Sequence, residues 1–219
     1  MHRFTHILIL ALALALGAGA AAKAHPHIWA EARLEVGVSG DREVEWLRHV
    51  WRFDELFSST VLFEFDTDRD LKLSAAELEE VASVIHESLA EFDYFQMVSR
   101  DGKRVKMEAP ERLIANFDGD HLIVAFESRP SETLRLEGKV DFGVYDPTFF
   151  TAIDFYEDEM LMVAGMPDDC QREVVRPDPM EALQQNQDTL TEAFFNEPGG
   201  VDYSSLFATR LQLNCQASG

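Results

Sequence analysis

A stretch of twelve residues carries oxygen atoms at a spacing suited to a hard cation. Its oxygens fall at positions 1, 3, 5, 7, 9 and 12, supplied by Asp66, Asp68, Asp70, Lys72, Ser74 and Glu77. Lys72 would offer only its backbone carbonyl, whereas Ser74 would offer its hydroxyl directly or through water. Calcium takes six to eight oxygen ligands, and alternate residues of a tight loop point inward toward one ion. The stretch therefore predicts a calcium site.

This stretch and its flanks resemble the helix–loop–helix of calmodulin-like EF-hand proteins. Apolar residues at helical spacing precede the loop, and residues 75–92 are expected to form the second helix. Leu71 departs from the pattern, because the sixth position needs positive φ and is usually Gly. EF-hands also usually occur in pairs, and no second loop is found. A lone, strained site predicts weak binding, with a Kd of roughly 10⁻⁴–10⁻³ M. The alternative is a solvated acidic loop in which Ser74 caps a helix and Glu77 completes a capping box.

The first 24 residues read as a secretory signal, because a basic start precedes ten apolar residues from Ile7 to Leu16. That run is too short to span a bilayer, and Ala22-Lys23-Ala24 fits a cleavage site. The alternative is a membrane anchor.

The only cysteines are Cys170 and Cys215, and a disulfide between them fits an oxidising compartment. Two free thiols in a metal site are the alternative. We expect an exported mature chain that does not insert into the membrane.

Cleavage after residue 24 would create a second candidate metal site at the new N-terminus. The α-amine and imidazole of His25, with the imidazole of His27, can bind a transition metal such as nickel, cobalt, copper or zinc. Pro26 lacks the amide N–H that the square-planar amino-terminal mode requires. A further ligand from the fold is then needed, and His49 in the next expected strand is the leading candidate. The alternative is that these histidines only form a polar start to the first strand.

Residue patterns predict the elements that position these side chains. Residues 27–38 and 43–53 alternate as strands, and Asp54 is a candidate N-cap for a helix that leads into the acidic loop. Further β patterns occupy 122–126, 133–144, 149–156 and 160–163, with turns at 101–102 and 118–119. A late helix over 180–195 and a last strand toward Cys215 follow. We expect a β-rich α+β fold with antiparallel sheets or a sandwich, in which residues 25–219 form one domain and 54–92 an EF-hand-like insertion.

Composition and charge narrow the classes of function. The chain has 219 residues, of which 46% are hydrophobic and 27% charged, as expected of a globular protein. Its 19 basic and 40 acidic residues give a net charge of −21, which repels nucleic acid and anionic lipid and attracts cations. The sequence contains no serine-hydrolase, zinc-protease or phosphate-loop motif, so we expect no enzymatic activity.

Several segments together resemble a family of exported bacterial proteins of unknown function. The resemblance is carried by the signal-like start, residues 24–29 (Ala-His-Pro-His-Ile-Trp), residues 51–58, the acidic loop, residues 145–150 and the late cysteine. Members are often labelled as the periplasmic component of an ABC-type transport system and tend to lie near nickel/cobalt-type permeases. The resemblance implies a periplasmic location and a link to metal transport.

The leading hypothesis is a periplasmic metal-binding accessory protein. It would hold a transition metal at His25 and His27, exchange it with a membrane metal permease, and use calcium to stabilise its fold. The alternative is a calcium-stabilised interaction module that binds no transition metal.

Overall fold

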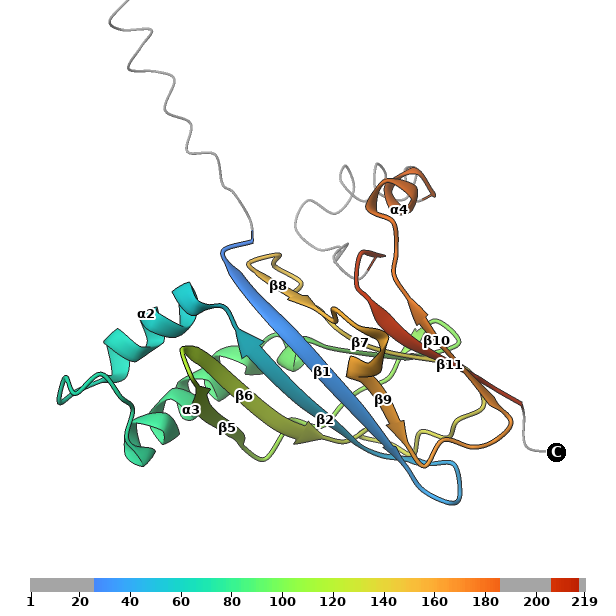
Figure 1. Cartoon of the computed structure of the whole chain (residues 1–219). Coiled ribbons are helices and arrows are strands. Elements are labelled where there is room, and N and C mark those ends of the chain that lie inside the picture. Colours follow the sequence, from blue (N-terminus) through green and yellow to red (C-terminus); the bar gives the residue numbers. More distant parts are fainter. Residues whose placement is uncertain (1–25, 186–205, 217–219) are drawn as a thin grey trace, which may run out of the picture.

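The computed structural model describes residues 26–185 and 206–216, and it contains two β-sheets and three helices (Figure 1). The first sheet has the order β5-β6-β2-β1-β8, with β9 also paired to β1. Its strands are β1 (Ile28–Val38), β2 (Val44–Phe53), β5 (Leu113–Asp118), β6 (His121–Ser128), β8 (Thr151–Asp154) and β9 (Leu161–Ala164). The expectation of a β-rich α+β fold is confirmed.

The second sheet has the order β10-β11-β7-β3-β4. Its strands are β3 (Gln96–Arg100), β4 (Lys103–Arg104), β7 (Gly138–Val144), β10 (Cys170–Val175) and β11 (Arg210–Cys215). Buried side chains from both sheets form one core. All pairings in this sheet are antiparallel, whereas β1 pairs in parallel with β8 and β9 in the first sheet.

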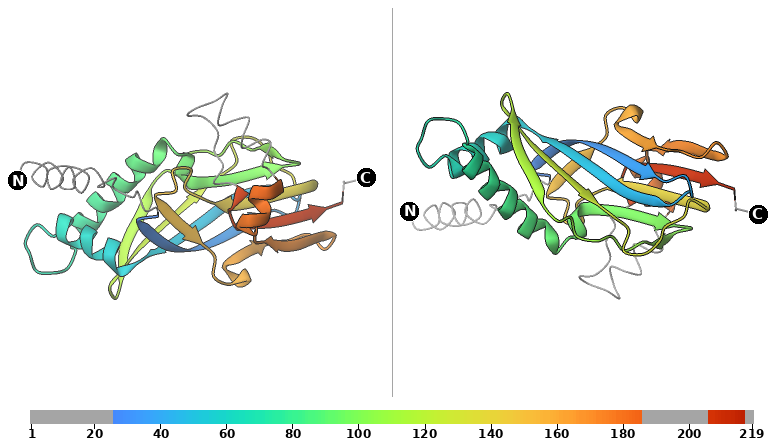
Figure 2. Two further views of the ribbon diagram at one scale, coloured as in Figure 1. Left: turned by 90° about the horizontal axis from the view of Figure 1, so that it is seen from above. Right: turned by 90° about the horizontal axis from the view of Figure 1, so that it is seen from below.

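Three helices accompany the sheets, namely α2 (Glu55–Phe65), α3 (Ala75–Ala90) and α4 (Pro179–Gln185). The pair α2 and α3 lies at one end of the molecule, while β10 and β11 lie toward the other (Figure 2). Both inserted helices lie where the sequence predicts them. Among the described residues, no helix combines the length and apolar character needed to cross a membrane.

Some element boundaries differ from the sequence-based expectations. The strand expected over 133–144 begins only at Gly138, and the one expected over 149–156 is limited to Thr151–Asp154. Residues before Gly138 instead make single bridges or loop contacts, such as Glu43 with Arg135. Strand β10 was not expected, because its exposed side chains show no apolar alternation. The late helix is described as far as Gln185, and the rest of its predicted range lies outside the described residues.

The predicted disulfide is confirmed between Cys170 and Cys215. The two cysteines are direct register partners on β10 and β11, so the bond joins neighbouring strands of the second sheet. In the chain-entropy account, closing a loop of 45 residues stabilises the fold by about 4 kcal/mol. Such a bond fits an oxidising compartment.

His49 lies inside the core, where sequence reasoning had placed a metal ligand. Its ring is fully buried, stacks on Phe126 at 4.5 Å between centroids and meets Trp51 edge-on at 6.3 Å. Neither ring nitrogen has a hydrogen-bond partner among the described residues. Burial lowers the pKa of His49 to about 3, although the nearby Gln96 side chain favours the charged form without meeting hydrogen-bond geometry.

The buried neutral ring makes stability depend on pH. In the unfolded chain His49 regains a pKa near 6.5, so the unfolded state binds more protons than the folded state once the pH falls below that value. Stability is therefore complete above about pH 6.5 and declines toward pH 3. Between pH 7 and pH 5 we expect a loss of about 2 kcal/mol from this residue.

Replacing His49 by Leu should remove this loss, so that the unfolding free energy of His49→Leu falls less than that of the wild type between pH 7 and pH 5. Urea denaturation with the disulfide intact measures both. His27→Gln provides the control, because it removes an exposed histidine and leaves the buried His49 in place. Equal declines in the wild type and His49→Leu would contradict the assignment.

Candidate cation site

The acidic loop between α2 and α3 brings three carboxylates together. Asp66, Asp68 and Asp70 each offer one oxygen, and these oxygens all lie within 4.8 Å of one another. Asp66 is buried at the end of α2, whereas Asp68 and Asp70 are exposed. This grouping of three carboxylates is compatible with binding of a metal ion, and the three residues occupy positions 1, 3 and 5 of the predicted loop.

The loop backbone folds around the carboxylate of Asp66. Oxygen Oδ2 of Asp66 accepts the Leu71 amide at 2.8 Å, and Oδ1 accepts the Asp70 amide at 3.2 Å. Leu71 has φ of 65° and Arg69 has φ of 62°, so both adopt the left-handed conformation. The expectation of positive φ at the sixth loop position is confirmed, and Leu71 bears a cost of about 1 kcal/mol that Gly would avoid.

Charge repulsion within the cluster is visible at Asp68. The largest single influence on its pKa, the hydrogen bond from the Asp70 amide, lowers that pKa. The negative charge of Asp70 opposes it, followed by partial desolvation, the Asp66 side chain and the charge of Glu77. The net effect raises the pKa of Asp68, because neighbouring negative charges disfavour a further one. A cation would relieve this repulsion.

Glu77 closes the loop by hydrogen bonds, in the arrangement of the predicted capping box. Its Oε1 accepts the Thr67 amide at 2.8 Å and the Thr67 hydroxyl at 2.6 Å. Its Oε2 accepts the amide and the hydroxyl of Ser74, both at 2.8 Å. The Ser74 hydroxyl in turn accepts the Glu77 amide, which completes the box at the start of α3. Glu77 does not belong to the group of three converging carboxylates.

The hydrogen bonds from Thr67 and Ser74 lower the pKa of Glu77 to about 2, with the Thr67 hydroxyl as the largest influence. The folded state therefore favours the charged carboxylate. This contribution to stability is present above the usual glutamate pKa and is lost as the pH falls toward 2. The sequence analysis does not identify Thr67 as a residue of the site. Thr67 directly follows Asp66, so its amide and hydroxyl lie at the start of the loop.

Lys72 and Ser74, the remaining predicted ligands, lie on the path of the loop beyond the three aspartates. The Lys72 amide donates to Oδ1 of Asp70 at 2.8 Å, and the Lys72 side chain is exposed. The hydroxyl of Ser74 is engaged with Glu77. The structure thus brings three of the six predicted ligands into one group and holds Ser74 and Glu77 together in the adjacent capping box.

The predicted transition-metal ligands do not all converge. His25 and the predicted signal peptide lie outside the described residues, and His27 is exposed just before β1. His49 pairs in register with Leu34, which is seven residues beyond His27. At about 3.3 Å per residue, this places His49 roughly 23 Å along the strand from His27. His49 is also buried in the core, so the expectation that it shares a metal with His27 is wrong.

Two further histidines have structural hydrogen bonds. His86 Nε2 lies 2.8 Å from the carbonyl oxygen of Pro110, and His121 Nδ1 lies 2.8 Å from that of Phe53. His86 lies on α3, and His121 is the first residue of β6.

The chain belongs to a family described as a protein of unknown function, DUF1007, whose model matches residues 9–215. The resemblance to an uncharacterised family is therefore confirmed over nearly the whole chain. No curated protein matches the sequence.

The strain at Leu71 leads to a test of the loop geometry. Leu71→Gly should raise the unfolding free energy by about 1 kcal/mol, because Gly adopts φ of 65° without steric cost and the exposed Leu71 side chain contributes little burial. Chemical denaturation measures the change. Lys72→Gly is the matched control, since Lys72 is not among the positive-φ residues and Gly there should destabilise. Destabilisation by Leu71→Gly would contradict the strain.

Proposed function

We propose that this protein is an exported metal-binding accessory protein whose loop over residues 66–77 binds calcium. The observation that carries the proposal is the convergence of the Asp66, Asp68 and Asp70 oxygens within 4.8 Å, around a turn with left-handed Leu71. These carboxylates stand at loop positions that suit calcium, a hard cation. The net charge of −21 further favours cations. The proposal includes no enzymatic activity.

Calcium would compete with the capping box for Glu77. In calcium loops of this length the twelfth residue supplies two oxygens to the ion. Both Glu77 oxygens already accept hydrogen bonds from Thr67 and Ser74, so coordination requires these four bonds to rearrange. This cost supports weak binding, of the order expected for extracellular modules. Calcium would then connect the end of α2 with the start of α3.

A periplasmic location and a membrane metal permease as partner complete the proposal. The disulfide supports an oxidising compartment, and the family resemblance supports the permease. The transition metal, nickel, cobalt, copper or zinc, would be held at the new N-terminus by the His25 amine and imidazole and by His27. The His27 amide donates to the carbonyl of Phe150 at 2.8 Å, and the two rings lie 5.0 Å apart between centroids, so His27 lies beside the start of β8.

The burial of His49 favours a second candidate function, a calcium-stabilised interaction module without a transition metal. Without His49, the predicted imidazole ligands at the new N-terminus are those of His25 and His27. Direct titration of the processed protein with each metal separates the two functions, because the interaction module would bind calcium only.

Calcium binding is tested by thermal unfolding. At about ten times its Kd, calcium should stabilise the wild type by roughly 1.4 kcal/mol and raise its Tm. Asp68→Asn should lose part of this rise, since it removes one ligand charge, keeps an amide oxygen and leaves the capping box intact. Asp120→Asn removes an equal charge from the exposed β5–β6 turn and serves as the control. An equal rise in Asp68→Asn and the control would place the calcium elsewhere.

The N-terminal site is tested by moving the amine. A chain with one additional residue before His25 keeps both imidazoles but displaces the α-amine, so it should bind nickel or copper more weakly, by about tenfold or more. His27→Ala should lose part of the affinity. The amine and imidazoles must lose protons to bind, and affinity should therefore fall steeply below about pH 6. Isothermal titration measures each case. Undiminished binding by the extended chain would exclude the amine as a ligand.

A further inference from the structure

Strand β5 lies at the edge of the first sheet, with β6 as its partner and no strand on its other side among residues 26–185 and 206–216. The two-residue turn Gly119-Asp120 joins β5 to β6, and Asp118 faces His121 across it. Residues that flank such a turn exchange hydrogen bonds with each other. Because the pattern alternates, Asp118, Asn116 and Ile114 direct their peptide groups to β6. The peptide groups of Phe117, Ala115 and Leu113 then face the open edge.

A local contact of the backbone agrees with this assignment. The Phe117 amide donates to Oδ1 of Asn116 at 2.9 Å, a local side-chain acceptor, as expected of an amide that faces away from β6. An exposed strand edge presents a row of donors and acceptors that only another extended backbone can satisfy regularly.

The other edges of the two sheets carry features that discourage strand addition. Strand β4 has only two residues, both basic, and β8 has four. Arg172 covers the edge of β9 by donating to the Leu161 carbonyl at 2.8 Å, and β10 carries Arg172 and Glu173. Strand β5 has six residues and contains neither Pro nor any charged residue before Asp118. In the described chain it is therefore the edge least protected against pairing.

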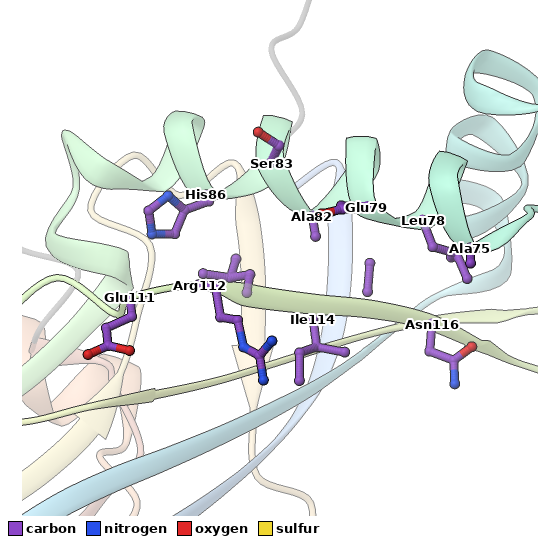
Figure 3. A pocket seen from close by; sticks show the side chains of 12 residues that line it. Ala75, Leu78, Glu79, Ala82, Ser83, His86, Glu111, Arg112, Ile114 and Asn116 are labelled. Atoms are coloured by element: carbon purple, nitrogen blue, oxygen red, sulfur yellow. The ribbon is translucent and has the colours of Figure 1, made fainter.

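A groove of about 560 Å³ runs between this edge and α3 (Figure 3). The helix covers one face of β5, where Leu113 and Ala115 are buried, while Ile114 extends to the other side and is 53% exposed. Two further hollows adjoin the groove and have lining residues in common with it. One shares Ile114 and Arg112 with the groove, and the other shares Leu78 and Asn116. A helix beside an edge strand is the arrangement in which peptide-binding domains capture an extended peptide by strand addition.

We propose that the groove between α3 and β5 binds an extended, basic segment of a partner protein as an additional strand. The open peptide groups of β5 select an extended backbone, and its six residues match a segment of about six residues. Apolar side chains of the segment would contact Ile114 on the side away from the helix, and its basic side chains would lie on the helix side near Glu79. Glu79 and Glu111 line the groove, Arg112 extends to the side away from the helix, and the chain charge of −21 favours a positive partner.

Pairing of two copies through β5 is disfavoured by the same charge. Two chains of net charge −21 repel each other, whereas a basic segment is attracted. The proposal does not depend on calcium or transition-metal binding, because none of its contacts involves the three aspartates or the N-terminal histidines.

The experiment uses the mature protein, isotope-labelled for NMR, and a peptide of about eight residues that alternates Lys and Val. The same peptide N-methylated at alternate residues and a Glu-Val peptide are the comparisons. We expect the Lys-Val peptide to slow hydrogen exchange at the outward amides of Leu113 and Ala115, with little change at Ile114. N-methylation or acidic side chains should weaken binding at least about tenfold. Equal binding of all three peptides would overturn the proposal.

Two variants distinguish peptide binding in the groove from general attraction by the charge of the protein. Ile114→Lys replaces an apolar contact with the segment by a charged side chain while its backbone still pairs with β6, and it should weaken Lys-Val binding at least about tenfold. Val84→Lys is the control, because Val84 is an exposed residue of α3 that does not line the groove. Equal weakening by both variants would contradict the proposal. In the absence of peptide, protection of the Leu113 and Ala115 amides that increases with protein concentration would show self-pairing. That result would likewise overturn the proposal.

Discussion

The junction between the first sheet and the helix–loop–helix depends on Asp54. One oxygen of its carboxylate caps α2 by accepting the amides of Leu56 and Phe57, and the other accepts the Trp29 amide of β1. The Asp54 amide donates to the Trp29 carbonyl, and its carbonyl accepts the Ser58 hydroxyl at 2.7 Å. A single residue at the end of β2 therefore determines where the helix starts and how it meets β1.

Ser58 links this junction to β6. Its hydroxyl is buried and accepts the Leu122 amide at 2.8 Å while donating to the Asp54 carbonyl. The first turn of α2 is thus bonded to the strand that pairs with β5. Loop 66–77 begins at the far end of α2, so its position relative to the sheet depends on these few polar contacts. Losing the Ser58 hydroxyl would leave the Leu122 amide without this partner, which costs roughly 1–3 kcal/mol, whereas the Asp54 carbonyl still accepts the Ser58 amide.

Local patterns predicted this part of the protein well because its determinants are short-range. The N-cap at Asp54, the capping box of Ser74 and Glu77 and the left-handed Leu71 each involve residues within a few positions of one another. His49 shows the opposite case. The polar character of His49 suggested a metal ligand, but its side chain points into the core. Side chains of β2 alternate between the two faces of the sheet, and the register with β1 places His49 on the buried face. Strand β10 was missed for a related reason, since its partner β11 lies far away in the sequence.

The structure also shows that the two sequence interpretations of the acidic loop are not exclusive. The capping box is present, and the three aspartates still converge beside it. In this arrangement Glu77 stabilises the start of α3 through Thr67 and Ser74 without any metal. The same helix forms one wall of the groove beside β5, beginning at Ala75 and Leu78. Because these bonds already hold the start of that wall, the groove forms without calcium, and a cation that draws Glu77 away from Thr67 and Ser74 would act first on the end of the groove at Ala75 and Leu78.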